Sequence, residues 1–255
     1  MIYITINSKG GVGKSTLANQ ILPPYIYLKN NKKAKLIEID DENNDSAIIN
    51  NSDILEAKTI HTSKIKTIDE IFIDDEDVIV DVGGNKTATI FLSEMKKIGE
   101  FQNVTWFIPV GQGLQDTANA MDTQRTITEL DKEANIIFVL SNNRTDDVAW
   151  EYLHFFGNEF LDTPFSIHDK DTKYIIIKSS DIVNNAKTFG KTVYDIAQNK
   201  TDFKVEAKKA KAEKKDDLKR KYLFLNRVKN EAIEYTNNLI ENVYKELDKI
   251  IKERK

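Results

Sequence analysis

The most informative segment of this sequence is Ser8-Lys9-Gly10-Gly11-Val12-Gly13-Lys14-Ser15-Thr16. It follows the apolar, largely β-branched run from Ile2 to Ile6, so a short strand leads directly into a glycine-rich loop. Three glycines within four positions let the backbone turn its N–H groups inward without a Cβ in the way, which makes a concavity for phosphate oxygens. The stretch therefore predicts a loop that binds phosphate groups.

The residues after the loop strengthen this prediction. Thr16 to Leu22 is typical of the first turns of a helix, whose N-terminus adds a partial positive charge at the same point. In a P-loop, a lysine placed as Lys14 reaches the β- and γ-phosphates, and a hydroxyl placed as Ser15 binds Mg²⁺. The alternative is a flexible loop with two solvated lysines, but strand, loop and helix contexts all favour a nucleoside triphosphate site.

Two features distinguish the loop from the general pattern, namely Ser8 in place of the first glycine and the second lysine, Lys9. The sequence Lys-Gly-Gly-Val-Gly-Lys-Ser-Thr resembles the deviant Walker A motif of the ParA/MinD family of P-loop ATPases. This resemblance implies ATP and Mg²⁺ as cofactors, and a Lys9 that crosses a dimer interface to touch the nucleotide of the partner subunit. The nucleotide-binding residues that it implies in the loop are Lys9, Gly10, Gly11, Val12, Gly13, Lys14, Ser15 and Thr16.

Strands and helices alternate along the first 200 residues. We expect strands at 2–6, 34–40, 77–82, 104–109, 136–140 and 165–167, and helices from Thr16 to about 30 and at 85–98, 114–130, 145–160 and 184–198; short helices near 46–51 and 68–72 are less distinct. This alternation predicts an α/β fold with a mostly parallel, doubly wound P-loop NTPase sheet covered by helices on both faces. We expect a ParA-like ATPase domain at residues 1–200 and a charged C-terminal helical extension at 201–255.

Two carboxylates stand at the ends of predicted strands. Asp81 closes the most apolar one and is the natural Walker B residue, which holds Mg²⁺ directly or through water. Glu38 and Asp40 share one face of an earlier strand, because alternate side chains point the same way. The structural alternative is an ordinary turn residue at Asp81 and a solvated acidic turn from Asp40 to Asp45.

The segment around Asp40 resembles the Asp-x-Asp-Pro-Gln switch segment of ParA-like proteins, with two departures. Glu38 replaces the first aspartate, and Asp41-Glu42 replaces Pro-Gln. The resemblance makes Asp40 the catalytic residue that positions the hydrolytic water, together with Lys9 and Lys14. It makes Ser15, Asp40 and Asp81 the metal-binding set.

Later segments resemble the part of the family that holds the base. Phe107-Ile108-Pro109-Val110 is similar to the strand that ends in proline before the dimer-facing helix. Asn142 and Asn143 both stand where relatives place an asparagine that reads the adenine edge, and the sequence does not decide between them. Lys178 and Ser179 fall where the backbone after the last strand closes over the base. The resemblance covers about residues 1 to 198 and is strongest at the loop.

Composition excludes several classes of protein. The chain has 255 residues, 40% of them hydrophobic, and a formal net charge of −4, which is unlike a globally basic nucleic-acid binder. It has no cysteine, so disulfides, thiolate metal sites and thiol catalysis are excluded. No apolar run approaches the roughly 20 residues that cross a bilayer. The three histidines are not spaced like the ligands of a metal ion. We expect a cytoplasmic protein.

The C-terminal segment differs from the rest in charge. Residues 204–255 hold sixteen Lys or Arg and ten Asp or Glu, which gives a net charge of +6 against −10 for residues 1–203. Apolar residues recur at helical spacing and predict a long helix with one packed face: Leu218, Tyr222, Leu225, Ala232, Leu239, Val243, Leu247 and Ile250. That face can pack on the core or on a second copy, and the basic part can bind DNA phosphates. A membrane helix is the least favoured reading, because acidic residues interrupt the segment.

The resemblance implies an ATPase for DNA segregation, with a plasmid or other replicon as cargo. Such a protein forms an ATP-sandwich homodimer, binds nonspecific DNA of the nucleoid in that state, and is released by slow hydrolysis that a ParB-like centromere-binding partner stimulates. No helix-turn-helix segment precedes the loop, as in the small partition ATPases that leave centromere binding to the partner. Two alternatives stay open: a MinD-like ATPase that positions another cargo, and a weakly hydrolysing, nucleotide-gated scaffold.

Overall fold

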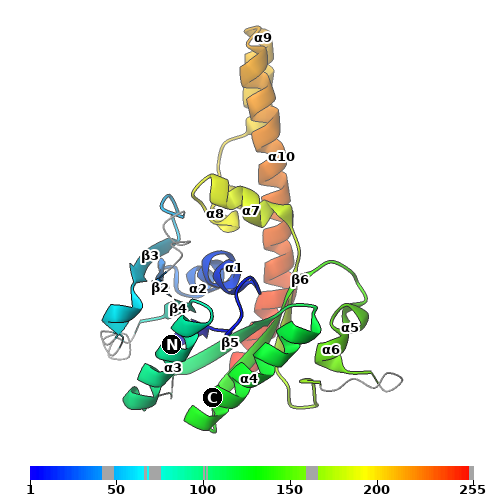
Figure 1. Ribbon diagram of the computed structural model, residues 1–255. Coiled ribbons are helices and arrows are strands. Elements are labelled where there is room, and N and C mark those ends of the chain that lie inside the picture. Colours follow the sequence, from blue (N-terminus) through cyan, green and yellow to red (C-terminus); the bar gives the residue numbers. More distant parts are fainter. Residues whose placement is uncertain are drawn as a thin grey trace.

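The computed structural model describes residues 1–41, 49–65, 68, 76–99, 101, 103–158 and 166–252. Its centre is a seven-stranded, wholly parallel sheet in the order β3-β2-β4-β1-β5-β6-β7 (Figure 1). The strands are β1 (Ile2–Thr5), β2 (Ala34–Ile39), β3 (Leu55–Ile60), β4 (Val78–Val82), β5 (Val104–Val110), β6 (Asn135–Asn143) and β7 (Tyr174–Lys178). The strand that leads into the glycine-rich loop, β1, is the middle strand, so the loop lies at the centre of the sheet's carboxyl edge.

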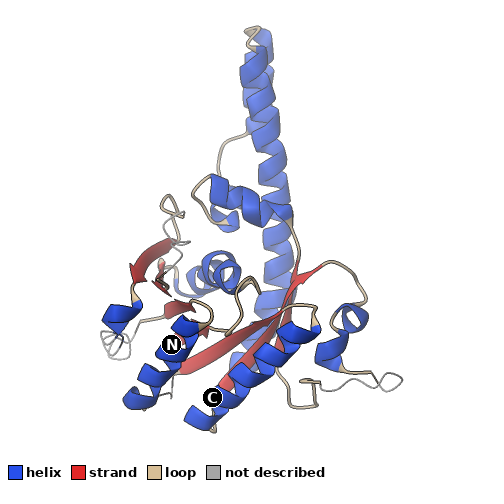
Figure 2. Ribbon diagram, in the orientation of Figure 1, coloured by secondary structure: helices blue, strands red, loops and turns tan. Residues whose placement is uncertain are grey.

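Helices cover both faces of this sheet (Figure 2). They are α1 (Lys14–Thr16), the π-helical η1 (Leu17–Ile21), α2 (Leu22–Asn30), α3 (Lys86–Ile98), α4 (Leu114–Leu130), α5 (Val148–Glu151), α6 (Leu153–Phe156), α7 (Asp181–Thr188), α8 (Val193–Ala197), α9 (Phe203–Ala212), α10 (Asp216–Asn238), the π-helical η4 (Leu239–Tyr244) and α11 (Lys245–Lys252). The predicted doubly wound α/β fold is confirmed.

Alternation along the strands divides the core into two clusters. Ile2 and Ile4 of β1 pack with α3, α4 and α6 on one face, whereas Tyr3 packs with η1, α2 and the C-terminal helices on the other. The same alternation places Trp106 on the first face and Phe107 on the second. Since both faces are covered, every residue of β4 and β5 is buried, as parallel sheets require.

Several predicted boundaries were wrong. Strand β3 was not predicted, because Glu56, Ala57 and Lys58 interrupt its apolar pattern at the exposed edge of the sheet. Ser166 and Ile167 form no strand, and the edge strand β7 follows them instead. The helix expected at 184–198 is split at Gly190, whose φ of 65° ends it. The helices expected near 46–51 and 68–72 lie largely outside the described residues.

The C-terminal segment is a helical hairpin rather than one continuous long helix. A turn at Glu213 to Lys215, with Lys214 at φ 58°, separates α9 from α10. The two helices pack side by side, and the Phe203 ring stacks on the Tyr222 ring with centroids 6.3 Å apart. Figure 1 shows the hairpin standing away from the sheet while α10 continues down to it. The sequence contains no Gly or Pro there, so nothing in it marked the turn.

The lower half of this segment is part of the core. Val228, Ala232, Leu239, Val243 and Leu247 are buried in the cluster that also holds η1 and α2. Polar contacts fix it there as well, because the Tyr244 hydroxyl donates to the Ile21 carbonyl at 2.9 Å and the Tyr25 hydroxyl to the Asp248 carboxylate at 2.8 Å. The predicted packed face therefore lies on the core from Ala232 to Ile250. Its first part does not, because Leu218, Tyr222 and Leu225 are only partly buried within the hairpin. The division into two domains stays a prediction.

None of the helices within the described residues is both long and apolar enough to span a membrane.

Candidate nucleotide site

The glycine-rich loop has the conformation that a phosphate cradle needs. Gly11 and Gly13 have φ of 76° and 100°, a region that L side chains avoid. A Cβ on Gly13 would also lie 3.0 Å from the Ser141 hydroxyl of β6. Gly13 is followed at once by α1 and η1, so the backbone N–H groups of the loop stand at a helix N-terminus.

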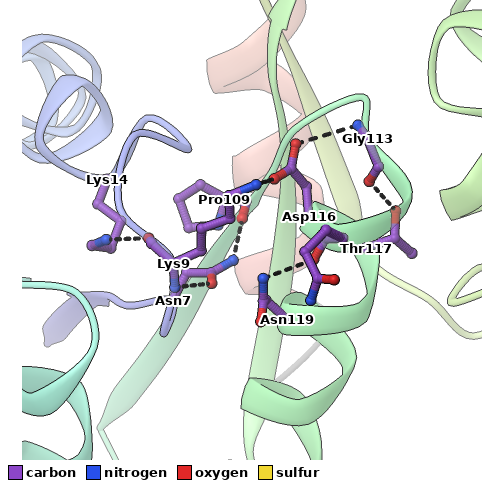
Figure 3. A network of polar contacts seen from close by, with 9 residues as sticks. Asn7, Lys9, Lys14, Pro109, Gly113, Asp116, Thr117 and Asn119 are labelled. Atoms are coloured by element: carbon purple, nitrogen blue, oxygen red, sulfur yellow. Dashed lines mark hydrogen bonds and ion pairs between the residues drawn. The ribbon is translucent and has the colours of Figure 1, made fainter.

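Asn7, at the end of β1, fixes the start of the loop. Its Nδ2 donates to the Pro109 carbonyl at 2.8 Å, and its Oδ1 accepts from the Lys9 N–H at 2.8 Å (Figure 3). The Lys14 ammonium donates to the Lys9 carbonyl at 2.7 Å. Burial lowers the pKa of Lys14, although the nearby Asp81 and Asp40 partly oppose this. A bound anion would relieve the cost of this buried cation.

A row of polar side chains crosses three adjacent strands beside Lys14. Thr5, Asp81 and Glu38 are register partners on β1, β4 and β2, and all are buried. The Thr5 hydroxyl donates to the Asp81 carboxylate at 2.7 Å. Burial raises the pKa of Asp81 to about 6, which hydrogen bonds from Thr5 and Ser15 partly offset. Two buried carboxylates in one row favour a cation between them and the loop.

Asp40 follows β2 and lies against the turn that leaves β4. A Cβ on Gly83 would come within 2.9 Å of the Asp40 carboxyl carbon, so only glycine permits this approach. The next residues reach the phosphate loop, because the Asn85 N–H donates to the Ser8 carbonyl at 2.6 Å. The acidic side of the loop is a pocket of about 280 Å³ lined by Gly10, Gly11, Gly13, Lys14, Ser15, Thr16, Glu38, Asp40, Asp81, Gly83, Gly84 and Lys187.

These residues fit Mg²⁺ held together with phosphate oxygens. The predicted metal set of Ser15, Asp40 and Asp81 lines this one pocket. Across the described part of the chain, no group of three or more His, Cys, Asp or Glu side chains could hold a metal ion by itself. A cation here would therefore take only some of its ligands from the protein, which is the usual arrangement for Mg²⁺ in nucleotide sites.

Lys9 occupies the other side of the loop. Its ammonium forms an ion pair with the Asp116 carboxylate of α4 in the same chain (Figure 3). Asp116 also accepts a hydrogen bond from the Gly113 N–H at 3.3 Å and so caps its own helix. Lys9 stays 40% exposed, which leaves it accessible to another subunit.

The second pocket, of about 340 Å³, lies on this side of the loop. It is lined by Lys9, Gly10, Gly11, Val12, Gly13, Thr16, Leu17, Ile21, Gly111, Gln112, Asp116, Val139, Ser141, Asn142, Ile177, Lys178, Ser179, Ser180, Val183, Asn184 and Tyr235. Its apolar and polar groups suit a nucleotide base and ribose. Among the predicted residues, Lys178 and Ser179 line this pocket.

The structure separates the two asparagines. Asn142 has φ 67° and lines the base-side pocket. Asn143 is buried, and its Nδ2 donates to the Glu151 carboxylate at 2.8 Å. Asn143 therefore has a structural partner, and Asn142 is the one of the two that is placed to reach a base.

Glu151 of α5 organises the loops at the mouth of this pocket. Partial burial raises the pKa of Glu151, but hydrogen bonds to its carboxylate outweigh this effect and hold the pKa below its usual range. The donors are the backbone N–H groups of Arg144 and Thr145 and the side chains of Thr145 and Gln112. The Gln112 amide donates to Glu151 at 3.2 Å and to the Asn142 carbonyl at 3.1 Å. One carboxylate thus ties together the loops after β5 and β6.

The sequence reasoning missed five residues that shape the site. Helical spacing gives no reason to single out Asp116, Glu151 or Tyr235, because each is brought to the site by a contact between distant segments. Gln112 follows the predicted strand that ends in proline, and this position was a usable signal. Lys187 of α7 lines the acidic pocket, and its ammonium forms no ion pair among the described residues.

Comparison with known proteins agrees with this architecture. No protein-family model matches the sequence, and no curated protein is significantly similar to it. Among solved structures, the MinD cell division protein of Aquifex aeolicus has a TM-score of 0.50 and 17% identity over 78% of this chain and 90% of that one. A chain of the MinC:MinD cell division protein complex of the same organism has a TM-score of 0.51 and 19% identity over 76% of this chain and 88% of that one.

A lower-scoring match is a chain described as a plasmid partition protein of Borrelia burgdorferi B31, with a TM-score of 0.48 and 12% identity over 89% of this chain and 97% of that one. The sheet order, the central phosphate loop and the two MinD comparisons lead to one conclusion about the fold. The chain has the fold of the P-loop ATPases of the ParA/MinD class.

Proposed function

We propose that this chain is an ATP-dependent DNA segregation ATPase that dimerises on ATP and binds nonspecific DNA. The observation that carries the proposal is the pairing of two lysines on one glycine-rich loop, with Lys14 buried beside Asp40 and Asp81 and Lys9 at the surface. One cation is placed for the chain's own phosphates and the other for a second subunit.

Each residue has a role that follows from its position. Lys14 and the N–H groups of the loop bind the phosphates, and Ser15 and Asp81 hold the metal. Asp40 orients a water molecule for in-line attack, because its carboxylate faces the same pocket as Lys14. Bound Mg²⁺ supplies the divalent charge that draws the buried carboxylates and phosphate oxygens together. Hydrolysis then removes the group that links two subunits, and a ParB-like partner accelerates this step.

The α9–α10 hairpin is the proposed DNA-binding surface. Residues 203–229 hold eleven Lys or Arg and four Asp or Glu, a net charge of +7 in a chain of net charge −4. Lys208, Lys211 and Lys221 are exposed and form no ion pair with any described residue. Cations that stand away from the acidic body are suited to phosphate contacts that read no sequence.

DNA retention at increasing salt tests this function. With ATP, the wild type should bind arbitrary duplex DNA, and the triple variant K208E/K211E/K221E should lose most of its affinity and show a shallower salt dependence, by about 0.9 in log–log slope for each lost phosphate contact. A control with K96E, K97E and K132E makes the same charge change on exposed lysines away from the hairpin. Equal loss in both variants, or equal binding with ADP, would contradict the proposal.

A nucleotide-gated scaffold is the second candidate, and one observation favours it. Asp41 stands in the changed switch segment, and its carboxylate accepts hydrogen bonds from the Thr62 N–H, at 2.7 Å, and from the Thr62 hydroxyl. This contact holds the segment beside β3, and a restrained switch segment would slow hydrolysis. Phosphate release that stays at background with DNA and partner present would support the scaffold. Sedimentation of the protein together with liposomes would instead indicate a MinD-like membrane ATPase. We propose a cytoplasmic location for the protein.

A further inference from the structure

We propose that Tyr235 of the C-terminal helix α10 is a base-contacting residue of the nucleotide site, and that the hairpin is coupled to nucleotide binding through it. The proposal rests on the proposed function only in taking ATP as the ligand. It assigns to the C-terminal extension a part in nucleotide binding that the glycine-rich loop alone does not indicate.

The position of Tyr235 supports the first step. Tyr235 lines the base-side pocket together with Leu17, Ile21, Ile177 and Val183. Its hydroxyl donates to the Lys178 carbonyl at 3.4 Å, within the segment that closes the pocket. Leu17 and Ile21 lie along the helix that leaves the phosphate loop, beyond the N–H groups that hold phosphate. A base bound on that side would therefore meet the apolar wall to which the Tyr235 ring belongs.

The helix that carries Tyr235 also supports coupling. Figure 1 shows α10 running from the hairpin past α8 and α7 to the sheet as one rod, and it packs against all three of α7, α8 and α9. Helix α10 begins at Asp216, directly after the hairpin turn, and runs without interruption to the pocket residue Tyr235. A change in the position of the Tyr235 ring cannot be absorbed by a loop between them.

A second contact joins the C-terminal helices to the helix that follows the phosphate loop. The π-helical η1 begins at Leu17, directly after α1, and the π-helical η4 directly follows α10. These two irregular turns meet, because the Tyr244 hydroxyl of η4 donates to the Ile21 carbonyl of η1 at 2.9 Å. π-Helical turns often mark functional positions. The C-terminal helices therefore contact both the pocket wall and the helix that follows the phosphate loop.

Binding of ATP and of inorganic tripolyphosphate, each with Mg²⁺, tests the contact. Y235A should weaken ATP binding by between about fivefold and a hundredfold, the range for losing an aromatic contact with a base, and leave tripolyphosphate binding within about twofold. Y235F loses only the hydroxyl bond and should cost about two- to fivefold. Tyr222 is the matched control, since it lies on the same helix but stacks on Phe203 in the hairpin, and Y222A should leave both ligands unaffected.

Hydrogen exchange of the wild type tests the coupling without a variant. ATP should slow amide exchange over residues 228–239, which form the end of α10 and the first residue of η4, whereas tripolyphosphate should protect the glycine-rich loop only. Unchanged exchange over 228–239 with ATP, or equal losses of ATP and tripolyphosphate affinity in Y235A, would overturn this inference. Failure of the wild type to bind ATP at all would instead overturn the proposed function.

Discussion

The Lys9 ammonium is paired with the Asp116 carboxylate of its own chain, at the surface where a second subunit would need it. Asp116 also caps α4, so the pair joins the phosphate loop to the helix after β5. A lysine held in this way must leave its carboxylate before it can cross to another subunit. In the proposed ATP-linked dimer, this ion pair would oppose dimerisation by the modest free energy of a partly exposed ion pair.

Removal of this carboxylate should favour the dimer. D116N should lower the ATP concentration at half-maximal dimerisation severalfold, about the change expected from losing a partly exposed ion pair. Analytical ultracentrifugation across an ATP titration measures it. D122N is the matched control, because Asp122 is an exposed aspartate on the same helix that pairs with Arg125 instead. A D116N protein that dimerises only as readily as D122N would contradict this effect of the ion pair.

The two lysines of the loop should separate in their effects. K14A should abolish nucleotide binding, because it removes the buried ammonium of the phosphate cradle. K9A should leave a monomer that still binds ATP, since the proposed role of Lys9 is to contact the nucleotide of the partner subunit. Fluorescent ATP binding and chromatography on the same samples distinguish the two. An ATP-dependent dimer of K9A would show that Lys9 does not act between subunits.

The stability of the ligand-free protein should depend on the charge of Asp81. Because burial raises its pKa to about 6, above the value of about 3.9 for an unfolded chain, the folded protein binds the additional proton between these pH values. Its stability therefore falls as the pH rises through this window. At pH 7.5, the free energy of unfolding of D81N should exceed that of the wild type by roughly 1–3 kcal/mol, so the variant should unfold at a higher temperature. D81N should also lose Mg²⁺-dependent ATP binding.

This gain should disappear on acidification. Near pH 4.5 most of the wild-type Asp81 is already protonated in the folded state, so the two proteins should unfold at nearly the same temperature. Thermal unfolding followed by circular dichroism at both pH values checks the prediction. D131N, which changes a carboxylate outside the site, should show no such difference between pH values. A D81N protein less stable than the wild type at pH 7.5 would contradict the buried charge.

Loss of Glu151 should loosen the mouth of the base-side pocket. E151A removes the acceptor shared by Asn143, Arg144, Thr145 and Gln112, so Asn142 is no longer held at the pocket. We expect weaker discrimination between ATP and GTP, with tripolyphosphate binding nearly unchanged. E133A changes an exposed glutamate outside the site and serves as control. Unaltered selectivity in E151A would show that the loops keep their positions without this carboxylate.

The sequence predicts the centre of the molecule better than its edges. Strands β1, β4 and β5 were predictable because both faces of each are buried, and their continuous apolar runs end at Asn7, Asp81 and Val110. Strand β3 was not, because an edge strand with exposed Glu56 and Lys58 lacks that signal. The carboxylates at strand ends were predictable for the same reason as the strands.

Residues that reach the site from distant segments could not be predicted in this way. Asp116, Glu151 and Tyr235 are ordinary helical residues until tertiary packing brings them to the loop. The hairpin was missed because Lys214 adopts a left-handed conformation with no glycine to mark the turn. Only the contacts of the folded chain reveal these positions.

The molar mass of D40A, measured by light scattering, shows whether ATP holds two subunits together. Without a group to orient water, the variant should keep its ATP, and it should elute with ATP at twice the chain mass of 29.2 kDa, but at the chain mass with ADP. A mass of 29.2 kDa in both states, or a dimer that dissociates as quickly as the wild type, would contradict an ATP-linked dimer whose lifetime Asp40 controls.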